Sequence, residues 1–322
     1  MNTSHRRTFL GQLSLGGLGA GFFRFQTPFA FNTNDQEAPT NLIIDADTAN
    51  EVDDLFAIAG ALLAPRLEII GLCSAQWHTQ ARAPRDSVGA SQALNEEILS
   101  LMGKTHIPHP IGSNIPLVNT YRPQNSEAAS FIIEQAMALP AGDKIHVAIL
   151  GPATNLASAI LLEPRIIPKV VAQYLGFWHD LESGTWSKRE FNTSNDPNAV
   201  DVLLNTPGLE FHVMTASTSQ HLIFEKTLVD RQLKGKGGIG DFLVERWENY
   251  DRFWKKEDPE KARWTMWDIA LILALAAPSL ATSTQVKSPY DNLERNIYAY
   301  TSIDETAMEH MYWKNFQQYF DK

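Results

Sequence analysis

Short apolar runs alternate with longer amphipathic stretches through the first two thirds of the chain. Runs this short, rich in Ile, Val and Leu, predict buried strands at residues 42–44, 67–74, 144–150, 170–177 and 210–214. The stretches between them repeat their apolar positions with the spacing of a helix, at residues 53–63, 87–102, 126–138, 154–162 and 196–204. This alternation predicts an α/β fold with a doubly wound, mostly parallel open sheet.

The last third of the chain has a different pattern. After the glycine-rich break at residues 235–238, residues 239–254 and 265–276 are predicted to be helical, and residues 295–302 form a late strand. We find no internal repeat and no low-complexity linker. The pattern therefore predicts one domain over residues 31–322, with a helical C-terminal elaboration.

The first thirty residues carry a targeting pattern. Two arginines, in HRRTFL at residues 5–10, precede a Gly/Leu/Phe-rich stretch that reaches residue 23. This is typical of a bacterial twin-arginine (Tat) export signal and predicts a periplasmic or secreted protein. The apolar part is too short and too rich in glycine for a stable membrane span. The alternative is a disordered N-terminus with a chance Arg-Arg pair.

Five carboxylates fall within ten residues directly after the first predicted strand. The segment DADTANEVDD at residues 45–54 lies between the apolar runs 42–44 and 55–59. It would form the loop from a strand to a helix at the C-terminal edge of the sheet, where open α/β folds place their ligand sites. Clustered carboxylates repel one another unless a cation or shared protons relieve them, and Ca²⁺ or Mg²⁺ prefers such oxygen ligands. The alternative is a solvated acidic loop with Asp53 and Asp54 in the first helical turn.

Net charge and cysteine content argue against two features, a nucleic-acid partner and an intramolecular disulfide. The formal net charge of −10 over 322 residues argues against a nucleic-acid partner. The single cysteine, Cys73, excludes an intramolecular disulfide, and its apolar neighbours predict a core position.

Four segments, in order along the chain, resemble the inosine-uridine nucleoside hydrolase family. The aspartate cluster at residues 45–54 is similar to the family's N-terminal cluster in a longer-loop form. GPATN at residues 151–155 resembles its central strand-to-helix turn, and EFN at 190–192 followed by DPNA at 196–199 resembles its Glu-Phe-Asn segment and the following helix. WDIA at residues 267–270 resembles the C-terminal His-Asp pair that opens a buried helix.

The resemblance implies Ca²⁺-dependent hydrolysis of an N-glycosidic bond in a ribonucleoside or related riboside, through an oxocarbenium-like transition state. It implies Ca²⁺ ligation by the carboxylates of Asp47, Asp54 and Asp268 and by the backbone carbonyl of Leu150. Asp47 would also be the general base that takes a proton from a metal-bound water. The ribose hydroxyls would be held by Asp53, Glu190 and Asn192. Asp45 would be a supporting acid, and a homo-oligomer is compatible with the resemblance.

The sequence departs from the family pattern at the leaving-group side. Trp267 occupies the position of a histidine that protonates the leaving base in one branch of the family, and an indole cannot act as an acid near neutral pH. The ribose-contacting asparagine expected after the second strand aligns with His78, which can hydrogen-bond a hydroxyl or be a loop histidine. Trp178 lies where a glycine-rich asparagine turn is expected, and its ring can stack on a base or belong to the rim of the core.

Two alternatives belong to other classes. One is an exported Ca²⁺-dependent ribose- or nucleoside-binding protein without turnover, motivated by Trp267. The other is a haloacid-dehalogenase-type phosphatase, because residues 43–48 fit its hydrophobic-Asp-x-Asp-x-Thr motif. In that case Asp45 would be the nucleophile and the metal would be Mg²⁺.

Overall fold

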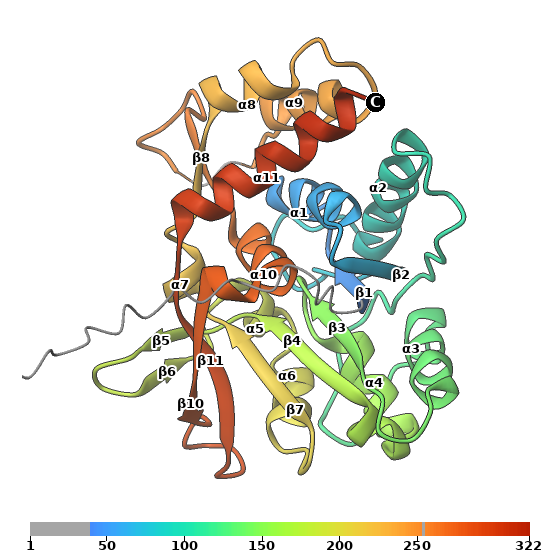
Figure 1. The fold of residues 1–322 in the computed structure, drawn as a ribbon. Helices are drawn as coiled ribbons and strands as arrows, with labels where there is room; N and C mark the ends of the chain where they lie inside the picture. Colours follow the sequence, from blue (N-terminus) through green and yellow to red (C-terminus); the bar gives the residue numbers. More distant parts are fainter. Residues whose placement is uncertain (1–38, 253–254) are drawn as a thin grey trace, which may run out of the picture. The chain divides into compact units, whose positions relative to one another are not determined.

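A computed structural model describes residues 39–252 and 255–322 (Figure 1). The predicted Tat signal at residues 1–30 lies outside the described residues. Within them, no helix is both long enough and apolar enough to pass through a bilayer.

A seven-stranded sheet forms the centre of the fold. Its strands, in chain order, are β1 (Thr40–Ala46), β2 (Leu67–Ser74), β3 (Ile145–Ile149), β4 (Val170–Leu175), β7 (Glu210–Met214), β10 (Ala281–Lys287) and β11 (Asn296–Ile303). In space the order is β10-β11-β7-β4-β3-β1-β2, and every neighbouring pair is parallel except β10 with β11. This confirms the predicted doubly wound, mostly parallel sheet.

Helices cover both faces of the sheet (Figure 1). One face packs against α3 (Glu127–Ala138), α4 (Thr154–Leu162) and α6 (Pro197–Leu204). The other packs against α1 (Asp53–Leu63) and α10 (Trp267–Ala276), with α2 (Ser87–Leu101) and α9 (Gly238–Asn249) beside them, and α11 (Glu305–Phe320) packs on α1 and α10 from outside. The central strands are buried on both sides, which explains why their sequences are continuous apolar runs.

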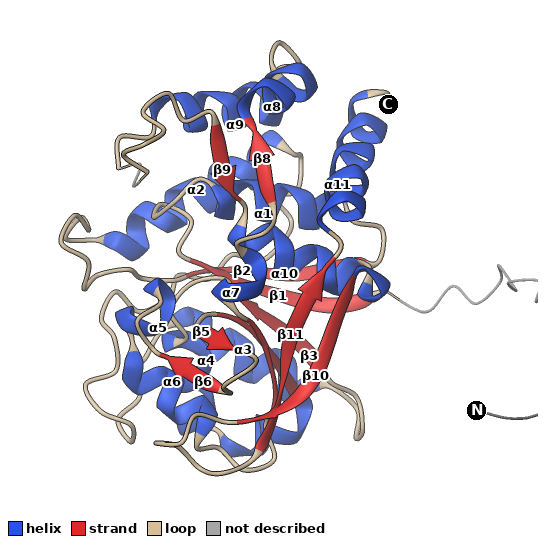
Figure 2. Ribbon diagram, turned by 90° about the vertical axis from the view of Figure 1, so that its left-hand side faces the viewer, coloured by secondary structure: helices blue, strands red, loops and turns tan. Residues whose placement is uncertain are grey.

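Several elements were not predicted. β10 pairs antiparallel at the sheet edge, and α11 ends the chain. Two small ribbons add to the main sheet (Figure 2): β5 (Trp178–Asp180) with β6 (Thr185–Ser187), and β8 (Ile223–Glu225) with β9 (Arg263–Thr265). The short helices are α5 (Phe191–Asn195), α7 (Ala216–Ser219) and α8 (Lys226–Leu233), with 3₁₀ turns at Pro164–Lys169 and Pro278–Leu280.

Two predicted boundaries were wrong. The strand expected over residues 170–177 ends at Leu175, because the backbone turns at Phe177, whose φ of 62° is left-handed. The helix expected from residue 239 to 254 ends at Asn249, since Tyr250 is extended. Both boundaries matter for the site, because Trp178 and Tyr250 lie directly beyond them.

Candidate active site

A cavity of about 830 Å³ opens at the C-terminal edge of the sheet. Residues shortly after β1, β2, β3 and β7 line it, and so do the C-terminal residue of β4 and the first turn of α10. This is the crevice in which open α/β sheets bind their ligands, since the carboxyl ends of the parallel strands meet there. All but one of the residues that the sequence predicted for the site lie on its wall: Asp47, Asp53, Asp54, Leu150, Trp178, Glu190, Asn192, Trp267 and Asp268.

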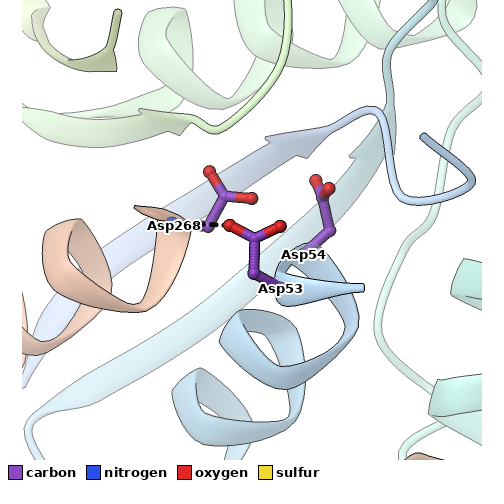
Figure 3. A group of neighbouring side chains, drawn as sticks. All are labelled: Asp53, Asp54 and Asp268. Carbon is purple, nitrogen blue, oxygen red and sulfur yellow. Dashed lines mark hydrogen bonds between the residues drawn. The ribbon is translucent and has the colours of Figure 1, made fainter. Parts of the chain in front are cut away.

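Three carboxylates from two helix starts meet in this cavity (Figure 3). Asp53 and Asp54 occupy the first turn of α1, and Asp268 occupies the first turn of α10. One carboxylate oxygen from each lies within 4.8 Å of the others. The backbone N–H of Asp268 donates to Oδ2 of Asp53 at 3.1 Å, so the two helix starts are joined directly. The positive ends of both helix dipoles point at these acids.

The acids are buried, and hydrogen bonds from protein groups compensate their negative charge only in part. Asp47, Asp54 and Asp268 are each at most 3% exposed. Burial, together with the negative charges of neighbouring acids, raises the pKa of each carboxyl well above its usual range. Among the described residues, Oδ2 of Asp47, Oδ1 of Asp54 and Oδ1 of Asp268 have no hydrogen-bond partner. Buried oxygens without a donor are costly, and a divalent cation supplies what they lack.

Asp47 lies between the ends of β1 and β3. A Cβ on Gly151 would come within 2.9 Å of Oδ1 of Asp47 and 3.0 Å of its backbone nitrogen, so only glycine fits there. The backbone N–H of Leu150 donates to the carbonyl of Asp45 at 2.8 Å and continues the pairing of the two strands. The Gly-Pro turn after β3 therefore brings the carbonyl of Leu150 to the same edge as Asp47.

Glu190 and Asn192 begin helix α5 at the opposite wall. Glu190 caps the helix by accepting from the backbone N–H groups of Asn192 at 3.0 Å and Thr193 at 2.9 Å. Asn192 is 5% exposed, and its Nδ2 donates to the carbonyls of Leu150 at 2.6 Å and Leu175 at 3.2 Å. Asn192 thus joins the ends of β3 and β4 and fixes the Leu150 carbonyl.

Two tryptophan side chains form an aromatic part of the wall. The rings of Trp178 on β5 and Trp267 on α10 meet edge to face, with 6.0 Å between centroids and 86° between planes. Trp178 is 38% exposed, which leaves one ring open to the cavity. The left-handed turn at Phe177 redirects the chain after β4 and places this tryptophan.

His78 was assigned to the sugar site from the sequence, and this stays a prediction, because Trp77 and Gln80 of the same loop line the cavity and His78 itself does not. It is exposed and does not line the cavity. Its backbone N–H is held by Oε1 of Gln76 at 2.6 Å, and its neighbour Trp77 lines the cavity instead. Trp77, in the loop after β2, is therefore a residue through which this loop reaches the cavity.

Asp45 does not reach the cavity. It is fully buried, does not line the wall and accepts from Nδ2 of Asn155 at 2.8 Å. Burial raises its pKa to about 7. A buried acid held in this way supports the strand end and cannot attack a substrate, so the phosphatase alternative does not fit the structure.

Several lining residues were not predicted. The segment Thr48–Glu51 is held from the far end of the chain: Tyr250 OH donates to the carbonyl of Asn50 at 2.6 Å, and Trp264 Nε1 donates to Oε1 of Glu51 at 2.8 Å. The guanidinium of Arg252 donates to the carbonyls of Ala49 and Asn50 and stacks 4.2 Å from the ring centre of Trp77. These contacts span about two hundred residues, so no local signal announces them.

Cationic side chains also line the cavity. They are Arg82, Arg189, Arg252 and Lys255. Only Arg189 had a signal in the sequence, because it directly precedes the Glu-Phe-Asn segment.

Comparison with known proteins identifies the type of site. Residues 42–308 match the model of the family described as inosine-uridine preferring nucleoside hydrolase. The chain is 26% identical over 270 residues to a probable uridine nucleosidase 2 of Arabidopsis thaliana, covering 76% of this chain and 80% of the relative. It is 25% identical over 235 residues to the pyrimidine-specific ribonucleoside hydrolase RihB of Escherichia coli O1:K1 / APEC, covering 65% and 72%. In structure it resembles a purine-preferring ribonucleoside hydrolase from Gardnerella vaginalis, with a TM-score of 0.69, 17% identity and coverage of 87% and 99%.

Proposed function

The chain belongs to the inosine-uridine preferring nucleoside hydrolase family, and on that premise we propose how its cavity hydrolyses the N-glycosidic bond of a ribonucleoside. Membership in a family of hydrolases favours a glycosidase over a binding protein without turnover. The observation that carries the mechanism is the group of buried carboxylate oxygens without a donor, on Asp47, Asp54 and Asp268. A wall of two tryptophans lines the same cavity.

Calcium is the cation that this donor set fits. Carboxylate and backbone carbonyl oxygens are hard ligands, and Ca²⁺ accepts them in a flexible geometry. Asp47, Asp54, Asp268 and the carbonyl of Leu150 would hold it. The cation would supply a positive charge that lowers the pKa of a water molecule and positions sugar hydroxyls. Asp53 belongs to the same close group of acids, but its Oδ2 already accepts the backbone N–H of Asp268.

Asp47 is the general base of the proposal. Its Oδ2 is buried and has no partner among the described residues, so it can accept a proton from the attacking water. Its Oδ1 packs against Gly151, which limits the rotation of the carboxylate. The pairing of β1 with β3 therefore orients the base.

Asp53, Glu190 and Asn192 hold the ribose. With Nδ2 of Asn192 bound to two carbonyls, its Oδ1 is the atom left to accept from a sugar hydroxyl. Glu190 and Asp53 each keep acceptor capacity beyond their backbone contacts. Fixed contacts to vicinal hydroxyls orient the sugar, and the surrounding carboxylates stabilise the positive charge that develops on its ring.

The leaving base would lie against Trp178 and Trp267. An aromatic ring can stack on any nucleobase, because every base has a π-face, and the contact needs no charged partner. Neither indole donates a proton as an acid near neutral pH, so the tryptophans position the base and do not protonate it.

Product analysis tests the proposal. Residues 31–322, saturated with Ca²⁺, are incubated with uridine and with inosine, and free base and free ribose are separated by chromatography. Equimolar base and ribose support the hydrolase, and Asp268→Asn should remove both products together with calcium binding measured by calorimetry. Tight binding of uridine without any product would instead favour the non-catalytic binding protein.

We also propose that residues 1–30 direct export through the twin-arginine pathway and that residues 31–322 form the working domain. The support is the Arg6-Arg7 pair followed by the glycine-rich apolar stretch. Replacing both arginines with lysine should retain the full-length chain inside the cytoplasm of a bacterial host, as shown by cell fractionation. Unchanged export of that variant would refute the assignment.

A further inference from the structure

Charge is distributed unevenly through the cavity, with acids at its floor and cations nearer solvent. The acids Asp47, Asp53, Asp54 and Asp268 are at most 3% exposed. Arg82 and Arg189 line the same cavity but are exposed to solvent. An uncharged nucleoside offers these two arginines hydroxyl and carbonyl oxygens but no negative charge to pair with.

Neither arginine has a structural duty that explains its position. In residues 39–252 and 255–322, neither guanidinium lies within 4.0 Å of a carboxylate, and neither donates a hydrogen bond to a protein acceptor. By contrast, Arg252 is occupied by the carbonyls of Ala49 and Asn50, and Lys255 donates to Oγ1 of Thr265. In a chain of net charge −10, two guanidinium groups that line one cavity without acidic partners among the described residues favour an anionic ligand.

The position of Arg189 indicates which part of the ligand carries the charge. It directly precedes Glu190, which begins the segment that we assign to the ribose hydroxyls. The proposed base position lies elsewhere, against Trp178 and Trp267. The anionic group therefore belongs on the sugar, where a ribonucleotide carries its 5′-phosphate.

The cavity has room for this addition. Its volume of about 830 Å³ is near the upper end of the range for small-molecule sites, roughly 300–1,000 Å³. A nucleoside alone would leave the outer part of such a space to water.

We propose that the preferred substrate is a ribonucleoside with a 5′-phosphate, held by Arg82 and Arg189. The inference rests on the proposed function only for the orientation of the ribose. The two arginines act as specificity determinants through charge-assisted hydrogen bonds to phosphate oxygens, for which the planar guanidinium is suited.

Binding measurements test this without turnover. We would titrate the calcium-loaded protein, residues 31–322, with ribose 5-phosphate and with ribose in a calorimeter. The phosphate ester should bind at least about tenfold more tightly, since each hydrogen bond to a charged group strengthens binding by about that factor. The preference should shrink at high ionic strength, because both arginines are near solvent.

Variants locate the phosphate. Arg82→Gln and Arg189→Gln should each reduce the ratio of the two affinities by about threefold or more, and the double variant should bring it close to one. Arg85→Gln is the matched control, because Arg85 is exposed in the same loop and does not line the cavity. Equal affinity of the wild type for ribose and ribose 5-phosphate would overturn the proposal. So would a preference that survives both substitutions, since the phosphate would then be held by the calcium ion.

Turnover separates this inference from the proposed function. Hydrolysis of uridine and uridine 5′-monophosphate at similar kcat/KM, with no arginine-dependent preference in binding, would leave the hydrolase and remove the phosphate site. An arginine-dependent preference for ribose 5-phosphate without hydrolysis of either compound would support the phosphate site and contradict the proposed hydrolase activity.

Discussion

Asp45 and Asp47 are two residues apart on one strand end, yet they have different surroundings. Asp45 is bound by Asn155 inside the fold, whereas Asp47 lines the cavity with its Oδ2 unpartnered among the described residues. The alternation of side chains along a strand places both on one face, and the end of β1 at Ala46 releases only the second into the loop. The two acids therefore differ in role because β1 ends between them, so that Asp45 stays in the strand and Asp47 lies in the loop.

Replacing Asp47 with asparagine tests its role as the base. The amide keeps the shape of the side chain but cannot accept the proton, so kcat should fall by about 10²–10⁴-fold. Calcium affinity should weaken as well, so kcat is measured at saturating calcium. Asp143→Asn, at an exposed position far along the chain, is the control and should leave kcat unchanged. An Asp47→Asn enzyme with wild-type kcat would remove Asp47 from this role.

For single residues, the sequence predicted the acids of the site but not the residues distant in the chain that contact the acidic loop. The acids of residues 45–54 were found because they directly follow a predicted strand, whereas Asp268 and the Glu-Phe-Asn segment were found through the resemblance to the family. His78 was the residue predicted from the loop after β2, and its neighbour Trp77, which lines the cavity, was not predicted. Tyr250 was not found because its bond to the Asn50 carbonyl joins residues that are two hundred positions apart.

Among the elements, the β5–β6 hairpin brings Trp178 against α10. The edge-to-face contact of Trp178 with Trp267 couples an exposed hairpin to the helix that carries Asp268. The hairpin was not predicted, because its strands have three residues each and no apolar run. β10 was missed for a related reason, since most of its residues are polar and exposed at the sheet edge.

A double-mutant cycle tests the aromatic wall. Trp178→Ala and Trp267→Ala should each lower kcat/KM for uridine by about tenfold, because stacking of one base on an aromatic ring contributes about 1–3 kcal/mol. The double variant should lose less than the product of the two effects, since the rings contact each other. Leu181→Ala, at an exposed position in the same hairpin, is the control. Independent, multiplying effects would show that the two rings do not form one wall.

Hydrogen bonds from Tyr250, Arg252 and Trp264, which we call the clamp of the acidic loop, hold the loop at residues 48–51. Tyr250→Phe keeps the ring and removes the hydrogen bond to the Asn50 carbonyl, a loss of about 1 kcal/mol. Because the loop positions Asp47 and Asp54, the calcium Kd should rise by about fivefold in calorimetry. The matched control is Tyr290→Phe, since Tyr290 is fully exposed. An unchanged calcium Kd in Tyr250→Phe would show that the clamp does not organise the metal site.

For the whole domain, buried acids link stability to both pH and calcium. Burial raises the pKa of Asp45 to about 7 and the pKa values of Asp47, Asp54 and Asp268 well above their usual range. A carboxyl whose pKa is higher in the folded state stabilises the fold fully below its unfolded pKa of about 4 and loses that contribution as the pH rises through the folded pKa. The metal-free protein should therefore become less stable as the pH rises from about 4 to beyond 7.

Calcium should reverse this trend, because it binds the ionised carboxylates. At calcium about 100 times the Kd, the free energy of unfolding should rise by about 2.7 kcal/mol near pH 8, which corresponds to a Tm increase of about 5–10 °C. Near pH 4.5 the increase should almost vanish. Differential scanning fluorimetry of residues 31–322, with calcium and with chelator, measures both. An equal calcium-induced shift at the two pH values would contradict ligation by these acids.

The fold as a whole followed from the alternation of apolar runs and amphipathic stretches, because a buried parallel sheet needs continuous apolar strands. The cavity did not follow from it, because its wall is assembled from the ends of five strands, a hairpin and the loops before α10. Sequence patterns located the acids and the two tryptophans, but only the folded chain shows that acids, aromatics and arginines share one space.

The most direct test of the central claim is the release of reducing sugar by residues 31–322 from a panel of purine and pyrimidine ribonucleosides and their 5′-monophosphates, with calcium and with chelator. We predict calcium-dependent release, abolished by chelator and restored by added calcium. Release that persists in chelator would contradict the metal site, and no release from any compound, with calcium bound, would contradict the assignment as a hydrolase of ribonucleosides.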